Sequence, residues 1–223
     1  MENQALYPAY FVSREPAAAF YSVVDNCPRF KRRKGTVLAI QCPYPGAPFG
    51  EGGVLHSIGT DHGTKAWSNP HTDGKVVAAL SSHEDGASAD DYDPKKFVGR
   101  SDDGYCFTDD LPNSWMSVDL GEGRAVVPTH YCLRHGSGSE SHVLRNWSLQ
   151  GKAAEPGADW VQIRRHDNDE TLAKQDYSVG AWPIEGEARA FRHFRIHQHG
   201  KNAEGTDYLM CCGFEVYGTL TEE

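Results

Sequence analysis

Two short stretches of this sequence carry side chains that could bind a ligand, and the first is aromatic. Trp67, Asn69 and His71 occupy alternate positions. An exposed indole beside an amide and an imidazole suits stacking on a sugar ring or on an aromatic side chain. A Trp that precedes Asn-Pro is more often a buried side chain leading into a turn. The stretch therefore has a binding interpretation and a structural one.

The second stretch is cationic. Arg134 and His135 end one apparent strand before the Gly- and Ser-rich residues 136–139, and His142 and Arg145 follow. A cationic rim of hydrogen-bond donors beside a loop suits an acidic peptide or a carboxylate. The alternative is that both arginines pair with Asp or Glu neighbours, because surface ion pairs are common and weak.

Catalytic patterns are scarce. His197 and His199 would place two imidazoles on one face of a strand, but no third metal ligand is evident nearby. Asp167 and Asp169 flank an Asn in an apparent turn, where such residues are expected anyway. No G-x-S-x-G motif, P-loop or paired-carboxylate motif stands out. We therefore expect a protein that is not an enzyme.

The balance of charged residues indicates which classes of partner the chain can bind. The chain has 223 residues, with 22 Lys and Arg against 31 Asp and Glu and a formal net charge of −9. This acidic balance argues against general nucleic-acid binding, which requires a basic surface. The one basic run, Lys31–Lys34, is interpreted as a solvated turn. No stretch is long and apolar enough for a membrane span.

The cysteines indicate a reducing compartment. All six are scattered rather than arranged in C-x-x-C pairs, so we expect free thiols and no zinc site. The first residues lack the layout of a signal peptide. We expect an intracellular, cytoplasmic protein; a secreted domain that has lost its signal peptide is the alternative.

Strands must position these side chains. Between Trp115 and Gly121, Met, Val and Leu alternate with other residues, and turn residues stand on both sides. Such alternation is typical of a strand with one face in a core, and its first residue, Trp115, is expected to pack there. The other expected strands are residues 35–42, 54–59, 76–82, 126–135, 146–151, 160–165, 181–184, 191–198 and 210–220. With no convincing amphipathic helix among them, the fold class is an all-β sandwich.

The chain divides near residue 50. Residues 43–53 are rich in proline and glycine, which break regular structure. We interpret residues 1–50 as an N-terminal extension with a short helix at residues 14–24, and residues 51–223 as the main domain. The acidic segment 83–110 has no evident regular structure, which is typical of a functional or mobile loop.

Three motifs, in order, resemble those of discoidin, or F5/8 type C, domains. Trp115–Gly121 resembles their W-I-x-V-D-L-G strand, Phe194–Ile196 their R-Y-I-R-I strand, and Phe214–Gly218 their closing E-x-Y-G strand. The resemblance covers Val54–Leu220. It implies a galactose-binding-like jelly-roll β-sandwich that acts as a non-catalytic recognition module.

Further stretches are similar to the intracellular discoidin-like domains appended to BTB-type adaptors and to some HECT-type ubiquitin ligases. These stretches are Gly53–Pro70, Pro128–Gly136, Arg145–Gly151 and Trp160–Asp169. The framing cysteine pair of the extracellular lectin-like branch is not found here. No BTB or HECT sequence is present, so a link to ubiquitin ligases is an inference from relatives.

The resemblance also implies a candidate metal site. Residues 95–105 fall where discoidin domains keep an L-V-D-G-N loop, which in carbohydrate-binding relatives holds a structural Ca²⁺ together with the glutamate of the final strand. Asp102, Asp103 and Glu215 are the matching oxygen donors, and Ca²⁺ takes several such ligands. The loop here reads Gly-Arg-Ser-Asp-Asp-Gly, so the alternative is that Arg100 replaces the cation by pairing with Glu215.

We expect the binding candidates to form one surface for a protein or peptide partner. The Trp67–His71 loop and the turn between Arg134 and Arg145 are expected at the same end of the sandwich, because loops carry recognition in such scaffolds. The module could belong to a ubiquitin-ligase or adaptor assembly. A lectin-type carbohydrate-binding module is the alternative function. No nucleic-acid or membrane partner is expected.

Overall fold

β-Strands make up nearly all the regular structure in the part of the chain that the computed structural model describes, which is residues 37–83, 92–102, 104–136 and 141–223. These residues belong to one unit, Gly35–Glu223. The helix expected at residues 14–24, the basic run Lys31–Lys34 and Asp103 lie outside the described residues. Within the described ranges, no helix has the length and apolar character needed to cross a membrane.

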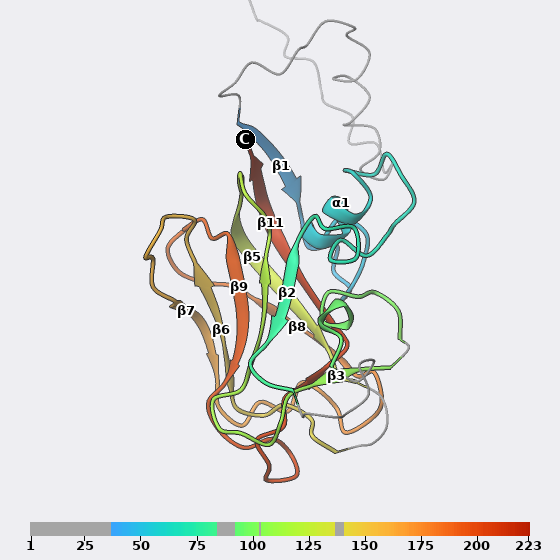
Figure 1. The fold of residues 1–223 in the computed structure, drawn as a ribbon, viewed down its shortest axis with the longest axis vertical. Helices are drawn as coiled ribbons and strands as arrows, with labels where there is room; N and C mark the ends of the chain where they lie inside the picture. Colours follow the sequence, from blue (N-terminus) through green and yellow to red (C-terminus); the bar gives the residue numbers. More distant parts are fainter. Residues whose placement is uncertain (1–36, 84–91, 103, 137–140) are drawn as a thin grey trace, which may run out of the picture. The chain divides into compact units, whose positions relative to one another are not determined.

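Four antiparallel strands form the first sheet (Figure 1). Their order in space is β1 (Leu38–Cys42), β11 (Gly213–Glu222), β5 (Arg124–Arg134) and β8 (Val179–Pro183). The pairing of β11 with β5 shifts register between Tyr217 and Gly218. Only glycine fits at this bulge, because a Cβ on Gly218 would lie 2.0 Å from the carbonyl oxygen of Val127.

Five antiparallel strands form the second sheet. Their order is β2 (Val77–Leu80), β4 (Trp115–Asp119), β9 (His193–Gln198), β6 (Trp147–Lys152) and β7 (Val161–His166). A short pair, β3 (Cys106–Phe107) and β10 (Met210–Cys211), lies outside both sheets. Helix α1 (Val54–Gly59) lies beside β11, and the 3₁₀ helix η2 (Pro94–Lys96) lies in the loop before β3.

The core is built from the inward positions of both sheets, as the alternation predicts. Met116 and Val118 of β4 are fully buried, and so are Phe194 of β9 and Phe214 and Val216 of β11. Because every second residue of a strand faces the same side, these positions place one apolar face of each sheet against the other. The expected all-β jelly-roll sandwich is confirmed, and every expected strand except residues 54–59 contains a strand.

The stretch Val54–Gly59, expected as a strand, is helix α1 instead. Its apolar residues fit one side of a short helix as well as a buried strand, so periodicity does not separate the two. The carboxylate of Glu215, on β11, accepts hydrogen bonds from the backbone N–H groups of Leu55 (2.8 Å) and His56 (3.0 Å). A helix leaves such N–H groups without partners in its first turn. A contact from a distant strand therefore stabilises the helix.

The boundary expected at residue 50 falls inside the sandwich. Strand β1 lies within the expected extension, yet it pairs with β11 from Leu38 opposite Glu222 to Cys42 opposite Gly218. Cys42 is 1% exposed and belongs to the core. The proline- and glycine-rich residues 43–53 consist mainly of turns and bends that connect β1 to α1.

The expectation that Trp115 packs in the core is wrong. Trp115 is half-buried on the outward face of β4, because the alternation that buries Met116 and Val118 turns the odd-numbered residues outward. A core position belongs instead to Trp147 at the start of β6, which is fully buried and donates a hydrogen bond to the hydroxyl of Tyr131 (3.0 Å).

Candidate functional site

A hollow of about 500 Å³ opens between three loops of the described chain. One loop follows α1, one holds η2 and leads to β3, and the third is the junction of β10 and β11. The residues that line it are Trp67, Asn69, Thr72, Lys95, Lys96, Gly99, Ser101, Gly104 and Cys212. A hollow of this size lies in the range of pockets that bind small molecules or part of a peptide.

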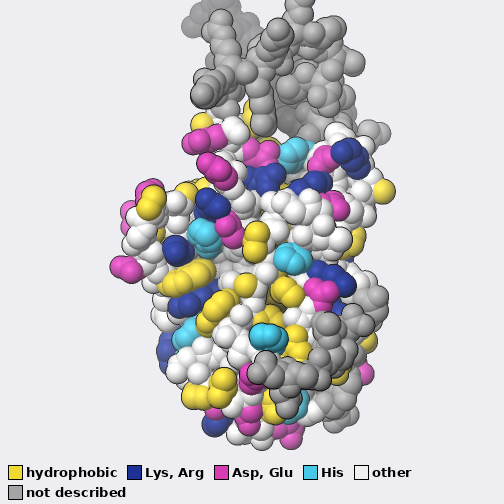
Figure 2. All heavy atoms as spheres, viewed as in Figure 1, with side chains coloured by type: hydrophobic (Ala, Val, Ile, Leu, Met, Phe, Trp, Pro, Cys, Tyr) yellow, Lys and Arg dark blue, Asp and Glu magenta, His cyan; other side chains and the backbone are white. Residues whose placement is uncertain are grey.

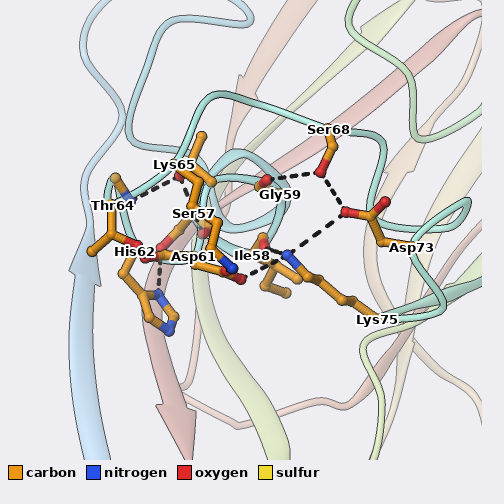
Figure 3. A network of polar contacts seen from close by, with 12 residues as sticks. Ser57, Ile58, Gly59, Asp61, His62, Thr64, Lys65, Ser68, Asp73 and Lys75 are labelled. Carbon is orange, nitrogen blue, oxygen red and sulfur yellow. Dashed lines mark hydrogen bonds and ion pairs between the residues drawn. The ribbon is translucent and has the colours of Figure 1, made fainter.

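A polar network fixes the loop after α1 (Figure 3). The ammonium of Lys75 donates to the carbonyl oxygen of Ile58 (3.1 Å) and to the carboxylate of Asp61 (2.6 Å). The hydroxyl of Ser68 donates to the carboxylate of Asp73. These contacts tie the beginning of the loop to its end. They also fix Trp67, which lies within this loop and lines the hollow.

Trp67 packs tightly against the end of α1. A Cβ on Gly59 would lie 2.8 Å from Nε1 of Trp67, so only glycine allows the indole to approach the backbone this closely. The side chain is half-buried, with part of its surface lining the hollow. Trp67 thus anchors its loop, as the structural interpretation expects, and also forms one wall of the hollow.

Asn69 bridges two of the loops. Its Nδ2 donates to the carbonyl oxygen of Lys95 (2.8 Å), and its Oδ1 accepts from the backbone N–H groups of His71 (3.0 Å) and Thr72 (3.4 Å). Nδ1 of His71 accepts from the backbone N–H of Ala78 on β2 (3.1 Å). Asn69 therefore holds the hollow together, whereas His71 is bound to the sheet and does not line it.

The loop that holds η2 supplies two lysines to the hollow. Asp93 caps η2, since its carboxylate accepts from the backbone N–H of Lys95 (2.9 Å) and pairs with the ammonium of the same residue (2.6 Å). Although burial opposes it, this pairing holds the pKa of Asp93 below its usual value. Lys96 differs from Lys95, because its ammonium has no hydrogen-bond or ion-pair partner among the described residues.

Glu215 and Arg100 form a buried ion pair behind this loop. Glu215 is 1% exposed, and its Oε2 lies 3.3 Å from Nη1 of Arg100. A third backbone N–H group, from Val216, donates to Oε1 (3.0 Å). Burial raises the pKa of Glu215 to about 7, against the opposing effect of Arg100 and the N–H donors. The alternative in which Arg100 pairs with Glu215 is confirmed.

The residues around Glu215 do not fit a calcium ion. Its oxygens already accept three backbone N–H groups and face a guanidinium, whose charge repels a second cation. Asp102 is exposed to solvent. No group of three or more His, Cys, Asp and Glu side chains in the described part of the chain is arranged to hold a metal ion.

Arg134 braces the wall of the hollow from behind. Its Nη1 donates to the carbonyl oxygens of Arg100 (2.8 Å) and Ser101 (2.7 Å), and its guanidinium lies 4.5 Å from the ring centre of Phe49. The neighbouring His135 is fully buried and is therefore a packed residue rather than part of a solvent-facing rim.

The other two cationic candidates contact different loops. Nδ1 of His142 lies 3.3 Å from the hydroxyl of Thr206. Arg145 is 8% exposed and donates to the carbonyl oxygens of Leu144 (3.0 Å) and Leu172 (2.9 Å), so it holds the loop after β7 in place. The structure thus brings Trp67, Asn69 and the loop braced by Arg134 together, and neither His142 nor Arg145 lines the same hollow.

Curated proteins with similar sequences include two ubiquitin ligases. The chain is 36% identical to E3 ubiquitin-protein ligase hecd-1 of Caenorhabditis elegans over 178 residues and 35% identical to E3 ubiquitin-protein ligase Ufd4 of Drosophila melanogaster over 177 residues, which are 78% and 77% of this chain. It is 32% identical to a BTB/POZ domain-containing protein of Arabidopsis thaliana over 200 residues, 85% of this chain. The chain spans only 6% of each ligase and 23% of the plant protein. No family model matches it.

Solved structures share the architecture. The F5/8 type C domain of a Bacteroides fragilis protein superposes with a TM-score of 0.52 at 14% identity, over 65% of this chain and 92% of that domain. CpGH89CBM32-5 from Clostridium perfringens, in complex with GalNAc-β-1,3-galactose, gives 0.50 at 14% identity, over 65% and 96%. The chain has the discoidin, or F5/8 type C, fold. The fold that the three motifs imply is therefore confirmed.

One signal in the sequence of this discoidin-like domain points to its lysines. Asp93-Pro94-Lys95-Lys96 has a capping residue followed by a proline in the first turn, a pattern that predicts a short helix. The pattern predicts η2 but does not say what faces it. Only the tertiary fold brings Lys96 and Trp67 to the same hollow.

Two aligned sets of polar side chains in the domain resemble catalytic triads, but the hydroxyl-bearing residue of each is buried. Oγ of Ser57 lies 2.9 Å from Nδ1 of His62, and Nε2 of His62 lies 3.1 Å from Oε2 of Glu222. Such an alignment activates a serine when substrate can reach it. Ser57 is 5% exposed and does not line the hollow, so this set joins α1 to β11.

The second set lies deeper in the core. The hydroxyl of Tyr131 lies 2.7 Å from Nε2 of His166, whose Nδ1 lies 2.6 Å from a carboxylate oxygen of Asp169. Burial lowers the pKa of His166, although Asp169 opposes this. The indole of Trp147 stacks on the imidazole with ring centres 4.1 Å apart. This enclosed network satisfies buried polar groups between the sheets.

Proposed function

We propose that this domain is a non-catalytic recognition module that binds a carboxylate-bearing segment of a protein partner in the hollow between Trp67 and Lys96. The observation that supports it most is the ammonium of Lys96, which has no partner among the described residues and lines a hollow with an indole wall. A charge beside a partly enclosed hollow attracts an anion more strongly than one in open solvent. The indole offers an apolar surface for the rest of the bound segment.

The relatives support a place in a larger assembly. Two of them are named E3 ubiquitin-protein ligases and the third is named a BTB/POZ domain-containing protein, and this chain matches a small part of each. We therefore propose that the module serves a ubiquitin-ligase or adaptor assembly by holding a substrate or a subunit. An intracellular location fits this role, because the five cysteines in the described ranges are buried thiols outside disulfide bonds.

A lectin-type module is the second candidate. It is favoured by Trp67 at the hollow and by the bound GalNAc-β-1,3-galactose in CpGH89CBM32-5. Sugar hydroxyls are recognised by planar polar side chains with free donors and acceptors. The amide of Asn69 is already used within the protein, which makes a glycan the weaker proposal.

Pull-downs from lysate with matched variants test the function. A genuine partner is retained by the wild-type chain and by Lys174→Gln, which alters an exposed lysine away from the hollow, and is lost with Lys96→Gln. With a carboxylate-bearing peptide of that partner, Lys96→Gln should weaken binding about tenfold.

A glycan array run in parallel separates the two candidates. Glycan binding that depends on Trp67 but not on Lys96 would replace the proposal with the lectin function. If no captured protein distinguishes Lys96→Gln from Lys174→Gln, the hollow is not the binding site.

A further inference from the structure

The outward face of the five-stranded sheet is a second surface with its own chemistry. Trp115 of β4 stands opposite His197 of β9, and Arg195 of β9 stands opposite Gln150 of β6. All four side chains are half-buried. Figure 2 shows basic, histidine and hydrophobic side chains gathered over the strands of this sheet. None of the four lines the hollow.

Arg195 is the central cation of this face. Its Nε donates to Oε1 of Gln150 (2.7 Å), and its guanidinium lies 4.4 Å from the ring centre of Trp160. No carboxylate within the described ranges pairs with it. Burial lowers the pKa of Arg195, because removal from water disfavours the positive charge of its guanidinium. The chain as a whole carries a formal net charge of −9.

Two carboxylates of this face are already neutralised. Asp119 forms a bidentate pair with Arg192, at 2.6 and 2.8 Å, and Asp167 forms one with Arg165. The ammonium of Lys152, which is opposite His193, has no ion-pair partner among the residues described. The face therefore presents unpaired cations on a molecule that is acidic as a whole.

We infer that this face binds an acidic, extended segment of a partner protein, independently of the hollow. The segment lies across β9 and places a carboxylate against Arg195, where charge complementarity and partial desolvation favour it. Its apolar residues pack on Trp115 and on Val77 of β2, which is 58% exposed. A flat sheet face accommodates an extended chain, whereas the hollow takes a single group.

The test uses the full chain and a fluorescein-labelled peptide of alternating Glu and Tyr, with fluorescence anisotropy as the readout. Arg195→Gln should weaken binding about tenfold and Lys152→Gln less, because the loss is larger for the more desolvated charge. Arg189→Gln is the matched control, since this guanidinium also stacks on an aromatic ring, that of Phe191 (5.4 Å). It should change the affinity less than about twofold.

Four results would overturn the inference. One is equal weakening by Arg189→Gln and Arg195→Gln, which indicates diffuse charge attraction. Another is undiminished binding of a peptide with Gln in place of Glu. A third is binding of phosphatidylserine vesicles but not of the peptide. The fourth is loss of binding with Lys96→Gln but not with Arg195→Gln, which assigns the peptide to the hollow. If Arg195→Gln does not fold, loss of affinity in folded Lys152→Gln supports the inference and unchanged affinity overturns it.

Discussion

Glu215 shows how one side chain determines the structure around it. Its carboxylate stabilises the first turn of α1 and pairs with Arg100, the cation that faces it where the family resemblance implies a calcium ion. The glycine before α1 makes this possible, because a Cβ on Gly53 would lie 2.2 Å from the carboxyl carbon of Glu215. The two residues thus depend on each other sterically, although 162 positions separate them in the sequence.

The substitution Gly53→Ala is therefore expected to destabilise the domain. The added methyl group must displace a buried, hydrogen-bonded carboxylate, and overpacking of this kind costs about 1–3 kcal/mol in the free energy of unfolding. Urea denaturation measures the loss. In a Glu215→Ala background the same substitution should cost less than about 1 kcal/mol, because the group it would strike is gone. Equal costs in the two backgrounds would contradict this account.

A pH dependence follows from the same carboxyl group. Its pKa is raised from the unfolded value of 4.5 to about 7, so between these values the folded state holds a proton that the unfolded state has lost. Stability from this group is complete below pH 4.5 and is lost as the pH rises to about 7. Urea denaturation of the wild type and Glu215→Gln across this range should show the downward slope only in the wild type. Parallel curves would show that Glu215 keeps its ordinary pKa.

At the scale of the element, the strands could be predicted and helix α1 could not. The alternation in β4 is a local property of the sequence, and burial of Met116 and Val118 follows from it. Helix α1 depends on a carboxylate from the last strand, and no local pattern contains that information. The same alternation places Trp115 on the side of the strand opposite Met116, and so predicts that Trp115 lies outside the core.

The two strand-initial tryptophans should therefore differ in their contribution to stability. Trp147→Ala leaves a cavity between the sheets and removes the donor to Tyr131, a change that costs about 3–5 kcal/mol. Trp115→Ala removes a half-buried side chain from the outer face and should cost clearly less. Thermal melting of both variants measures the difference. Equal losses would mean that the outer face contributes as much packing as the core.

At the scale of the whole molecule, the site could be predicted only in part. Trp67 and Asn69 are conspicuous in the sequence, and both line the hollow. Arg134 and Arg145 attract attention as cations, but the fold gives their donors to backbone carbonyl oxygens. These carbonyl oxygens are distant in the sequence, and only the tertiary structure brings them close to the two arginines. For the same reason, the pattern Asp93-Pro94-Lys95-Lys96 predicts a short helix but does not show that Lys96 lines a hollow.

The position of β1 predicts where the domain can be shortened. A chain that begins at Gly35 should melt at the same temperature as the full chain, because β1 remains paired with β11. A chain that begins at Pro43 loses that strand, exposes the edge of β11 and removes Cys42 from the core. It should melt several degrees lower, as about 1 kcal/mol already shifts the midpoint of a domain this size by about 2–4 °C. Equal melting temperatures for both would return the boundary to residue 50.

The pairing of β1 with β11 has a consequence for how this sandwich sits in longer polypeptides. Leu38 stands directly opposite Glu222, so the outer ends of β1 and β11 lie side by side, about 5 Å apart across the ladder. A unit attached in this way can be inserted into a surface loop of a host protein without pulling the two flanks of that loop apart. Its gain or loss between related proteins would then leave the host fold intact.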